Sequence, residues 1–296
     1  MTVTAATALE QVTKNVFTTT KIRGCNPSIV FTKEGSVFID TAQWITTLLE
    51  MKEFALQRGP IRYLINTEAH IDHIFGNHWF AGVCPVIGHE KLHEIFWQVP
   101  GDMNAYDYSV DVIKRQDPGA LHLMPLQKDY VFNPPSITFS DRMSLQLGDH
   151  TFKLYFTPGH SPSQICVYVP EERVVFVGDT IFANCQMWLH SADIDQLVAS
   201  LKFLGMLDVD HIVPGHGPVV TKEYLNVQIG FIYEWIGAVA AGISKGWSQD
   251  ECIERINFKS RYPVDIGQDE SMDYIQRTNV IKCYKYITER SGRSFF

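Results

Sequence analysis

The sequence lacks closely spaced cysteines. Its six cysteines lie far apart and never form a CxxC pair; they are Cys25, Cys84, Cys166, Cys185, Cys252 and Cys283. Zinc ribbons and dense disulfide frameworks both require such pairs, so neither is expected. We predict reduced and mostly buried thiols. Cys185 is the one to follow, because it lies just beyond a polar motif at Asp179.

The sequence also has no excess of positive charge and no long apolar run. It contains 25 Lys and Arg residues against 33 Asp and Glu residues, which gives a net charge of −8. Such a surface does not favour phosphate backbones, so nucleic acid is not expected as a partner. No run of about eighteen apolar residues occurs, and residues 1–15 lack a basic stretch followed by an apolar one. These absences predict a cytoplasmic protein without membrane contact.

The chain has enough apolar material for one large folded unit. Of its 296 residues, 45% are hydrophobic and 12% are aromatic, and no repeat, low-complexity block or flexible linker divides them. Strand-like and helix-like patterns alternate along the chain, which predicts the α/β class. We expect a single domain over 1–296, with a core at about 25–220 and a helical extension at about 221–296.

The first half of the pattern predicts a hairpin, a helix and two buried strands. Two β-rich runs flank Lys33-Glu34-Gly35, as in a hairpin. Apolar residues recur at helical spacing from Trp44 to Leu56, and short apolar runs follow at 61–67 and 84–89. Residues 98–135 combine Pro, Gly, aromatic residues and mixed charge, so we expect a long irregular insertion or lid there.

The second half of the pattern predicts another sheet and then helices. Four strand-like runs separated by short turns cover 142–149, 151–159, 164–170 and 173–179. A helix at 193–206 and a strand at 211–215 are expected next. Two later stretches have helical periodicity, at 231–246 and 271–290. Neither contains a cluster typical of a catalytic loop, so we assign both to packing or assembly.

The most informative stretch is Glu68-Ala69-His70-Ile71-Asp72-His73, which directly follows the strand-like run at 61–67. It places four potential metal ligands within six residues. In a loop that starts extended and then turns, Glu68 and His70 point to one side and the last two toward a neighbouring position. Two metal ions could then be held. A solvated loop or a helix cap is the alternative explanation.

Three further polar residues each follow an apolar strand-like run: His160 in TPGHSP, Asp179 in FVGDT and His216 in VPGHGP. A preceding glycine lets the backbone turn sharply, and a nearby proline fixes the loop. Each motif taken singly is an ordinary turn. Together with the Glu68–His73 cluster, they predict a metal site. Carboxylates and imidazoles suit zinc, manganese and iron, and the aspartate can bridge two ions.

This arrangement resembles the metallo-β-lactamase-fold superfamily, whose signature is HxHxDH followed by separate His, Asp and His ligands. The resemblance extends from about residue 25 to 220 and implies an αββα sandwich that holds two divalent metal ions. By this resemblance the first ion has three ligands of its own: Glu68, His70 and His160. The second ion has another three, and a carboxylate bridges both ions: Asp72, His73 and His216, with Asp179 as the bridge.

The chain departs from the signature at Glu68, which stands where the family has its first histidine. An anionic oxygen in place of a neutral imidazole hardens the first site and favours iron or manganese relative to zinc. Zinc is the first expectation, and iron and manganese stay open because of Glu68. A further alternative is that Glu68 is too long or misdirected to bind, which leaves one site weak. Members with glutamate here include diiron oxygenases of antibiotic assembly lines and some lactamase-like hydrolases.

Several other residues carry weaker expectations. Three histidines that follow the ligand cluster are expected to pack rather than to form a third metal site: His78, His89 and His93. His190 follows Asp179 closely enough to reach the pocket, where it would orient substrate or stabilise an oxyanion. Three apolar neighbours form either a wall of that pocket or part of the core: Phe182, Met187 and Trp188.

The resulting hypothesis is a dinuclear metal-dependent hydrolase. A water between the two ions loses a proton near neutral pH, and the metal-bound hydroxide attacks an acyl carbonyl. Asp72 orients that water and passes a proton to the leaving group. The resemblance implies a small-molecule substrate, which is an ester, lactone, thioester or β-lactam.

Two other classes of function stay open. One is a diiron enzyme that activates dioxygen, which Glu68 favours. The other is a non-catalytic member that uses the pocket for binding. The apolar face of residues 231–243 packs on the core or against a second copy, and we prefer a homodimer.

Overall fold

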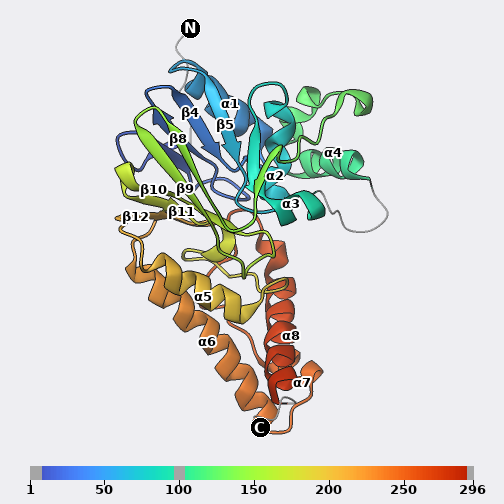
Figure 1. The fold of residues 1–296 in the computed structure, drawn as a ribbon. Helices are drawn as coiled ribbons and strands as arrows, with labels where there is room; N and C mark the ends of the chain where they lie inside the picture. Colours follow the sequence, from blue (N-terminus) through green and yellow to red (C-terminus); the bar gives the residue numbers. More distant parts are fainter. Residues whose placement is uncertain (1–8, 97–103, 292–296) are drawn as a thin grey trace.

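The computed structural model describes residues 9–96 and 104–291. Residues 1–8, part of the stretch searched for a leader, and residues 98–103 of the expected insertion lie outside the described residues. Within the described ranges the strands form two sheets with helices on both sides (Figure 1).

The first sheet contains seven strands of the described residues, arranged in sequence order: β1 (Leu9–Gln11), β2 (Val16–Thr19), β3 (Ser28–Thr32), β4 (Gly35–Ile39), β5 (Ile61–Ile65), β6 (Val86–His89) and β7 (Ile137–Phe139). Strands β1 to β4 pair antiparallel, whereas β4 to β7 pair parallel. In the β3–β4 hairpin Thr32 lies opposite Gly35, so the predicted hairpin is confirmed.

The second sheet contains five strands of the described residues, in the order β12-β11-β10-β9-β8: β8 (Arg142–Leu147), β9 (His150–Phe156), β10 (Ile165–Val169), β11 (Val174–Phe176) and β12 (His211–Val213). Strands β8 to β11 pair antiparallel, and β12 runs parallel to β11. Strands β9, β11 and β12 therefore run in the same direction, and their carboxyl ends meet at one edge of the sandwich.

The two sheets bury a common apolar core. Side chains that alternate inward from each sheet meet there, among them Val37 and Ile65 from the first sheet and Phe152 and Val167 from the second, all fully buried. Inward alternation of this kind follows from the two-residue period of a strand. The core between the sheets fixes their relative position and so the position of the loops at their edge.

Helices form the two outer layers. Helix α1 (Ile45–Leu56) buries Leu48 and Met51 against the outer face of the first sheet. Helix α5 (Ile194–Leu204) buries Leu201 against the outer face of the second sheet. The order helix, sheet, sheet, helix confirms the expected αββα sandwich.

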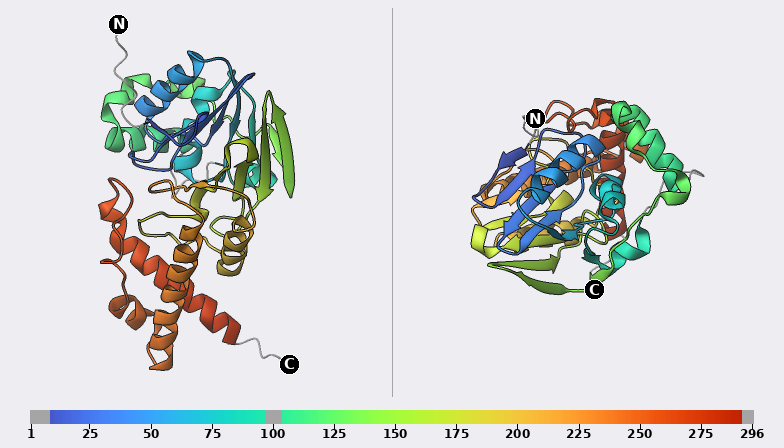
Figure 2. Two further views of the ribbon diagram at one scale, coloured as in Figure 1. Left: turned by 90° about the vertical axis from the view of Figure 1, so that its left-hand side faces the viewer. Right: turned by 90° about the horizontal axis from the view of Figure 1, so that it is seen from above.

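The remaining helical segments of the described residues are short connectors or belong to the extension: α2 (Ile71–Ile74), η1 (Phe75–Phe80), α3 (Glu90–Ile95), α4 (Ala105–Gln116), η2 (Pro118–Leu123), η3 (Gln127–Asp129), η4 (Pro170–Glu172), η5 (Gly178–Thr180), α6 (Glu223–Ser244), α7 (Gln249–Arg255), η6 (Asp269–Ser271) and α8 (Met272–Ser291). Figure 2 shows α6 and α8 projecting away from the sandwich beside α5.

The extension shares one apolar core with α5 and the outer face of the second sheet. Phe231 and Trp235 of α6 pack with Val280 and Cys283 of α8, and all four are buried. Among the described helices, α6 has the length and composition that a membrane span would also need. Its Phe231 and Trp235 lie inside the core that it shares with α8.

The expectation of an irregular insertion at 98–135 is wrong for residues 105–116, which form α4. The Asn104 side chain caps this helix by accepting a hydrogen bond from the Asp107 backbone N–H at 2.9 Å. Val112 and Ile113 are buried in a cluster with α1. The apolar stripe is short and Pro and Gly residues flank it, so the sequence pattern did not predict the helix.

Candidate metal centre

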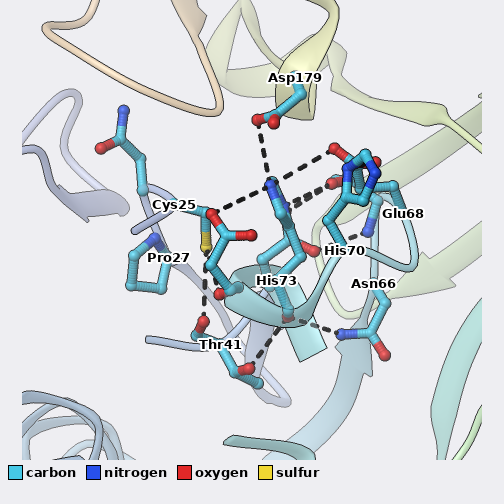
Figure 3. Close-up of polar contacts among 12 residues, drawn as sticks. Cys25, Pro27, Thr41, Asn66, Glu68, His70, His73 and Asp179 are labelled. Atoms are coloured by element: carbon cyan, nitrogen blue, oxygen red, sulfur yellow. Dashed lines mark hydrogen bonds and ion pairs between the residues drawn. The ribbon is translucent and has the colours of Figure 1, made fainter. Parts of the chain in front are cut away.

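Four of the seven candidate ligands lie on the loop that follows β5. Glu68 is fully buried before the loop turns, and His70 stands at the start of the short helix α2. Asp72 and His73 follow within that helix. Figure 3 shows Glu68 and His70 on one side of His73, with Asp179 approaching from the opposite sheet. The cluster is therefore not a solvated loop.

The other three candidate ligands follow the carboxyl ends of β9, β11 and β12. His160, Asp179 and His216 are all buried, with 1%, 5% and 5% of their surface exposed. Because these strands run in the same direction, their following loops lie at the edge where the β5 loop also emerges. Residues far apart in the sequence thus converge at one place.

Glycines permit this close approach of loops. Gly159, directly before His160, has φ +147, and an added Cβ would lie 2.3 Å from the backbone of Leu197. A Cβ on Gly215, directly before His216, would lie 1.9 Å from Asp179 Oδ1. No side chain fits at either position without displacing its neighbour. The glycines of the two PGH motifs therefore shape the site itself.

One group of ligand atoms, here called the first position, consists of Glu68, His70 and His160 together with Asp179. Glu68 Oε2 lies 2.7 Å from His70 Nδ1. His160 Nε2 lies 3.2 Å from His70 Nδ1 and 3.4 Å from Asp179 Oδ2. Glu68 is directed into the group, so it is not misplaced for binding.

The second position consists of Asp72, His73 and His216, and it also adjoins Asp179. His216 Nε2 lies 3.3 Å from Asp72 Oδ2 and 3.2 Å from Asp179 Oδ1. His73 Nε2 lies 3.1 Å from the same Asp179 oxygen. One carboxylate oxygen of Asp179 therefore faces the second position, and the other faces His160 in the first.

The donor sets fit metal cations. A tetrahedral site with metal–ligand bonds of about 2.0–2.1 Å has edges of about 3.3 Å, close to most of the separations just described. Both oxygens of Glu68 are buried and face imidazole nitrogens, with His70 Nδ1 2.7 Å from Oε2 and His73 Nε2 3.5 Å from Oε1. Nδ1 of His160 is buried without a hydrogen-bond partner among the described residues. A fully buried carboxylate is costly unless positive charge faces it, and a bound metal cation would supply that charge.

The electrostatics of the site also indicate that positive charge is needed there. Burial by itself raises the pKa of Asp72, but the neighbouring His73 and His216 lower it to about 2. Burial likewise opposes ionisation of Asp179, yet His216 and His73 hold its pKa well below the usual range. The carboxylates keep their charge although they are buried, so the site requires positive charge among them. Protonated imidazoles or metal cations can supply it.

A buried carboxylate that the sequence analysis missed supports His73 from behind. Asp40 Oδ2 lies 2.9 Å from His73 Nδ1, and Asp40 also accepts hydrogen bonds from the backbone N–H and hydroxyl of Thr67. Cys25 lies nearby, with its thiol donating to the Asp72 carbonyl at 3.1 Å. Burial raises the pKa of Cys25 to about 12, so this thiol stays protonated. The signal that could have revealed Asp40 is a lone aspartate ending a buried strand.

His216 has a corresponding partner in the extension. Asp265 Oδ2 lies 3.0 Å from His216 Nδ1, and both residues are buried. Asp265 belongs to the segment between α7 and α8, inside the expected helical extension but between the two stretches that the sequence analysis assigned to packing or assembly. No local motif marks it, because its partner lies 49 residues away in the sequence.

The site opens into a cavity of about 820 Å³. Phe182, Trp188 and His190 line it, as the sequence suggested, whereas Met187 is buried and is not among its lining residues. The His190 ring centroid lies 5.4 Å from that of His70. Burial lowers the pKa of His190 to about 4, with help from His70 and His160, so its ring is neutral near neutral pH. Tyr274 of the extension also faces this cavity.

The remaining residues singled out in the sequence lie outside the candidate ligand groups. His78 stacks on Tyr130, and His89 Nε2–H donates to the Ser140 carbonyl at 2.8 Å. His93 lies exposed in α3. Cys185 is buried, and burial raises its pKa to about 12. All six cysteines are free thiols, five of them buried, as expected.

Curated relatives share part of the chain. A hydroxyacylglutathione hydrolase of Francisella tularensis subsp. novicida is 34% identical over 30% of this chain and 38% of that protein. An atrochrysone carboxyl ACP thioesterase of Aspergillus fumigatus is 24% identical over 70% of this chain and 55% of that protein. The chain spans at most 60% of the length of the first curated relatives that it matches.

A solved structure and a family model also match most of the chain. A metallo-beta-lactamase from Pontibacter korlensis superimposes with a TM-score of 0.57 at 19% identity, covering 75% of this chain and 96% of that one, which shows the shared fold. The family model described as the metallo-beta-lactamase superfamily matches residues 21–216, the region that contains every candidate ligand. Because this match spans more than half of the 296 residues, the chain belongs to the metallo-beta-lactamase superfamily.

Proposed function

We propose that the protein is a metallohydrolase that cleaves an acyl substrate, foremost a thioester, with two divalent cations. The observation that carries this proposal is the convergence of seven buried or half-buried ligands into two adjoining groups at the wall of a large cavity. Glu68, His70 and His160 would hold one cation. Asp72, His73 and His216 would hold the other, with Asp179 between them.

When bound, the cations supply Lewis acidity, which polarises the carbonyl and makes a water molecule acidic enough to attack it near neutral pH. Asp72 lines the cavity and keeps its negative charge, so it can orient the attacking water and carry its proton to the leaving group. His190 is neutral near neutral pH and exposed at the cavity, where its N–H can donate a hydrogen bond to the developing oxyanion.

The cavity suits a substrate with an apolar acyl part and a polar carrier. Trp188 and Tyr274 form an aromatic pair on its wall, with ring centroids 6.0 Å apart. Arg23, Gln43 and Arg115 line it as well and offer hydrogen-bond donors to polar groups. The names of both relatives denote removal of an acyl group from a carrier, glutathione in one and ACP in the other. These features support a thioester among the acyl substrates.

The test is a hydrolysis assay on the purified, metal-replete protein with a panel of thioesters, esters, lactones and β-lactams. We expect turnover of at least one thioester and its loss in His70→Ala, because this variant removes a ligand of the first position. Unchanged turnover in His70→Ala, or no hydrolysis of any acyl substrate by a protein loaded with two cations, would refute the proposal.

Glu68 favours a second candidate function, which is oxygen activation at a diiron centre. Both of its buried oxygens are available to a cation and provide a hard anionic ligand, which suits iron better than an imidazole does. Elemental analysis and visible absorption separate the two functions. Bound iron with turnover that depends on dioxygen supports the second, and a colourless zinc protein that hydrolyses thioesters supports the first.

A further inference from the structure

Each histidine of the second position has a carboxylate hydrogen-bonded to its Nδ1. The two carboxylates come from different parts of the chain. His73 Nδ1 lies 2.9 Å from the buried Asp40, within the part of the chain that the family model matches. His216 Nδ1 lies 3.0 Å from Asp265, which lies 49 residues beyond the end of that match. The extension therefore contacts the candidate metal centre at His216 Nδ1, the ring nitrogen on the far side from Nε2, which faces the candidate ligands.

The segment that carries Asp265 is anchored to the sandwich on both sides. Before Asp265, the Gln186 side chain donates to the carbonyls of Phe258 and Tyr262 at 2.7 and 2.8 Å. After it, Arg23 donates to the Gly267 carbonyl and forms an ion pair with Glu270 at 2.9 Å. These anchors hold Asp265 buried behind the second position rather than in solvent.

We propose that Asp265 is a positioning residue of the second metal position and makes the C-terminal extension part of the metal centre. Its carboxylate accepts a hydrogen bond from His216 Nδ1–H, which places the proton on Nδ1 and leaves the lone pair of Nε2 facing Asp72 and Asp179. The hydrogen bond also fixes the ring plane and makes Nε2 a stronger donor. This inference rests on the proposed metal binding but not on hydrolysis.

The first position lacks such support among the described residues. His160 Nδ1 is buried without a hydrogen-bond partner there, and the His70 side chain is 32% exposed. Asp265 is thus expected to act on one cation only. Loss of a partner of this kind weakens metal affinity about 10- to 100-fold.

The experiment measures both cations in Asp265→Ala and Asp265→Asn by elemental analysis after dialysis and by competition with a chelator. We expect two cations in the unaltered protein and one weakened about 10- to 100-fold in Asp265→Ala. Asp265→Asn should fall between them, because the amide oxygen still accepts from Nδ1–H but carries no charge. Unfolding of the metal-free proteins checks that the variants fold.

Asp269→Asn is the matched control, since it removes the same charge from an exposed residue of the same segment. It should keep both cations. Glu68→Ala provides the complement and should weaken the other cation, so that the double variant with Asp265→Ala loses both. The inference is overturned if Asp265→Ala binds both cations as tightly as the unaltered protein, or if Asp269→Asn loses the same cation. A protein that loses one cation selectively but hydrolyses no substrate would refute the proposed function alone.

Discussion

The two metal positions share Asp179 but are built differently. Both histidines of the second position have a buried carboxylate behind them, Asp40 and Asp265. The first has an anionic ligand instead, in Glu68, and its His70 faces the cavity. Supports fix geometry, whereas a change of ligand alters charge and hardness. The second position is therefore the more preorganised of the two, and under the proposed function the charge of Glu68 would bias the metal that the first position binds.

The largest effect is expected from removing Asp179, the carboxylate that the two positions share. In Asp179→Ala both cations lose a ligand, so we expect less than one bound cation per chain and a loss of kcat/KM of about a thousand-fold or more. Elemental analysis and steady-state kinetics measure the two effects. Asp141→Ala, an exposed aspartate before β8, is the control and should change neither. Retention of either cation at full affinity would show that Asp179 does not bridge.

A smaller effect on rate is expected from His190, which lies beside the first position. Its ring centroid is 5.4 Å from that of His70 and 6.2 Å from that of His160. His190→Ala should lower kcat about 100-fold, as removal of an oxyanion donor does, and should leave both cations bound. The exposed His122→Ala serves as the control. Loss of a cation in His190→Ala would instead make this residue a ligand or a support.

A variant at Asp40 tests whether the carboxylate behind His73, which lies in the sandwich, differs in effect from Asp265 in the extension. Asp40→Ala removes the acceptor of the Thr67 backbone N–H and leaves His73 Nδ1 with only the Thr67 hydroxyl at 3.3 Å. Leaving a buried donor unpaired costs about 1–3 kcal/mol of folding stability. We expect lower thermal stability of the metal-free protein and weaker binding of one cation. Denaturant unfolding monitored by circular dichroism gives the first quantity. If the metal-free variant is as stable as the unaltered protein, Asp40 acts on the metal alone.

The mildest change alters only the character of the first position. Glu68→His restores a neutral imidazole, so the variant should bind more zinc relative to iron and manganese, several-fold more at equal supply of the three metals. The total should stay at two cations per chain. Elemental analysis after loading from an equimolar mixture measures the ratio. An unchanged ratio would mean that Glu68 does not set the identity of the metal.

Local patterns predicted much of the fold. The hairpin around Lys33-Glu34-Gly35 and the helix up to Leu56 are confirmed, because turn residues and apolar periodicity act over a few residues. Helix α4 was missed because its apolar stripe is short and Pro and Gly flank it. Its stability depends on Val112 and Ile113 packing against α1, which no local pattern reports.

The candidate ligands were also visible in the sequence, whereas their supports were not. All seven came from short motifs at strand ends, and the structure brings them together. Asp40 and Asp265 are single aspartates with no motif around them. Their significance depends on partners 33 and 49 residues away. Glu68 is visible in the sequence as a departure from the signature, but only the tertiary structure directs it into the first position.

The sequence by itself determined the alternation of strands and helices, the ligand types and the glycines that let those ligands turn inward, since each depends on chemistry within a few residues. Tertiary structure alone decided which histidines receive a carboxylate behind them and how the extension meets the sandwich. Those outcomes depend on how separate segments pack against each other, and packing between distant segments leaves no periodic trace along the chain.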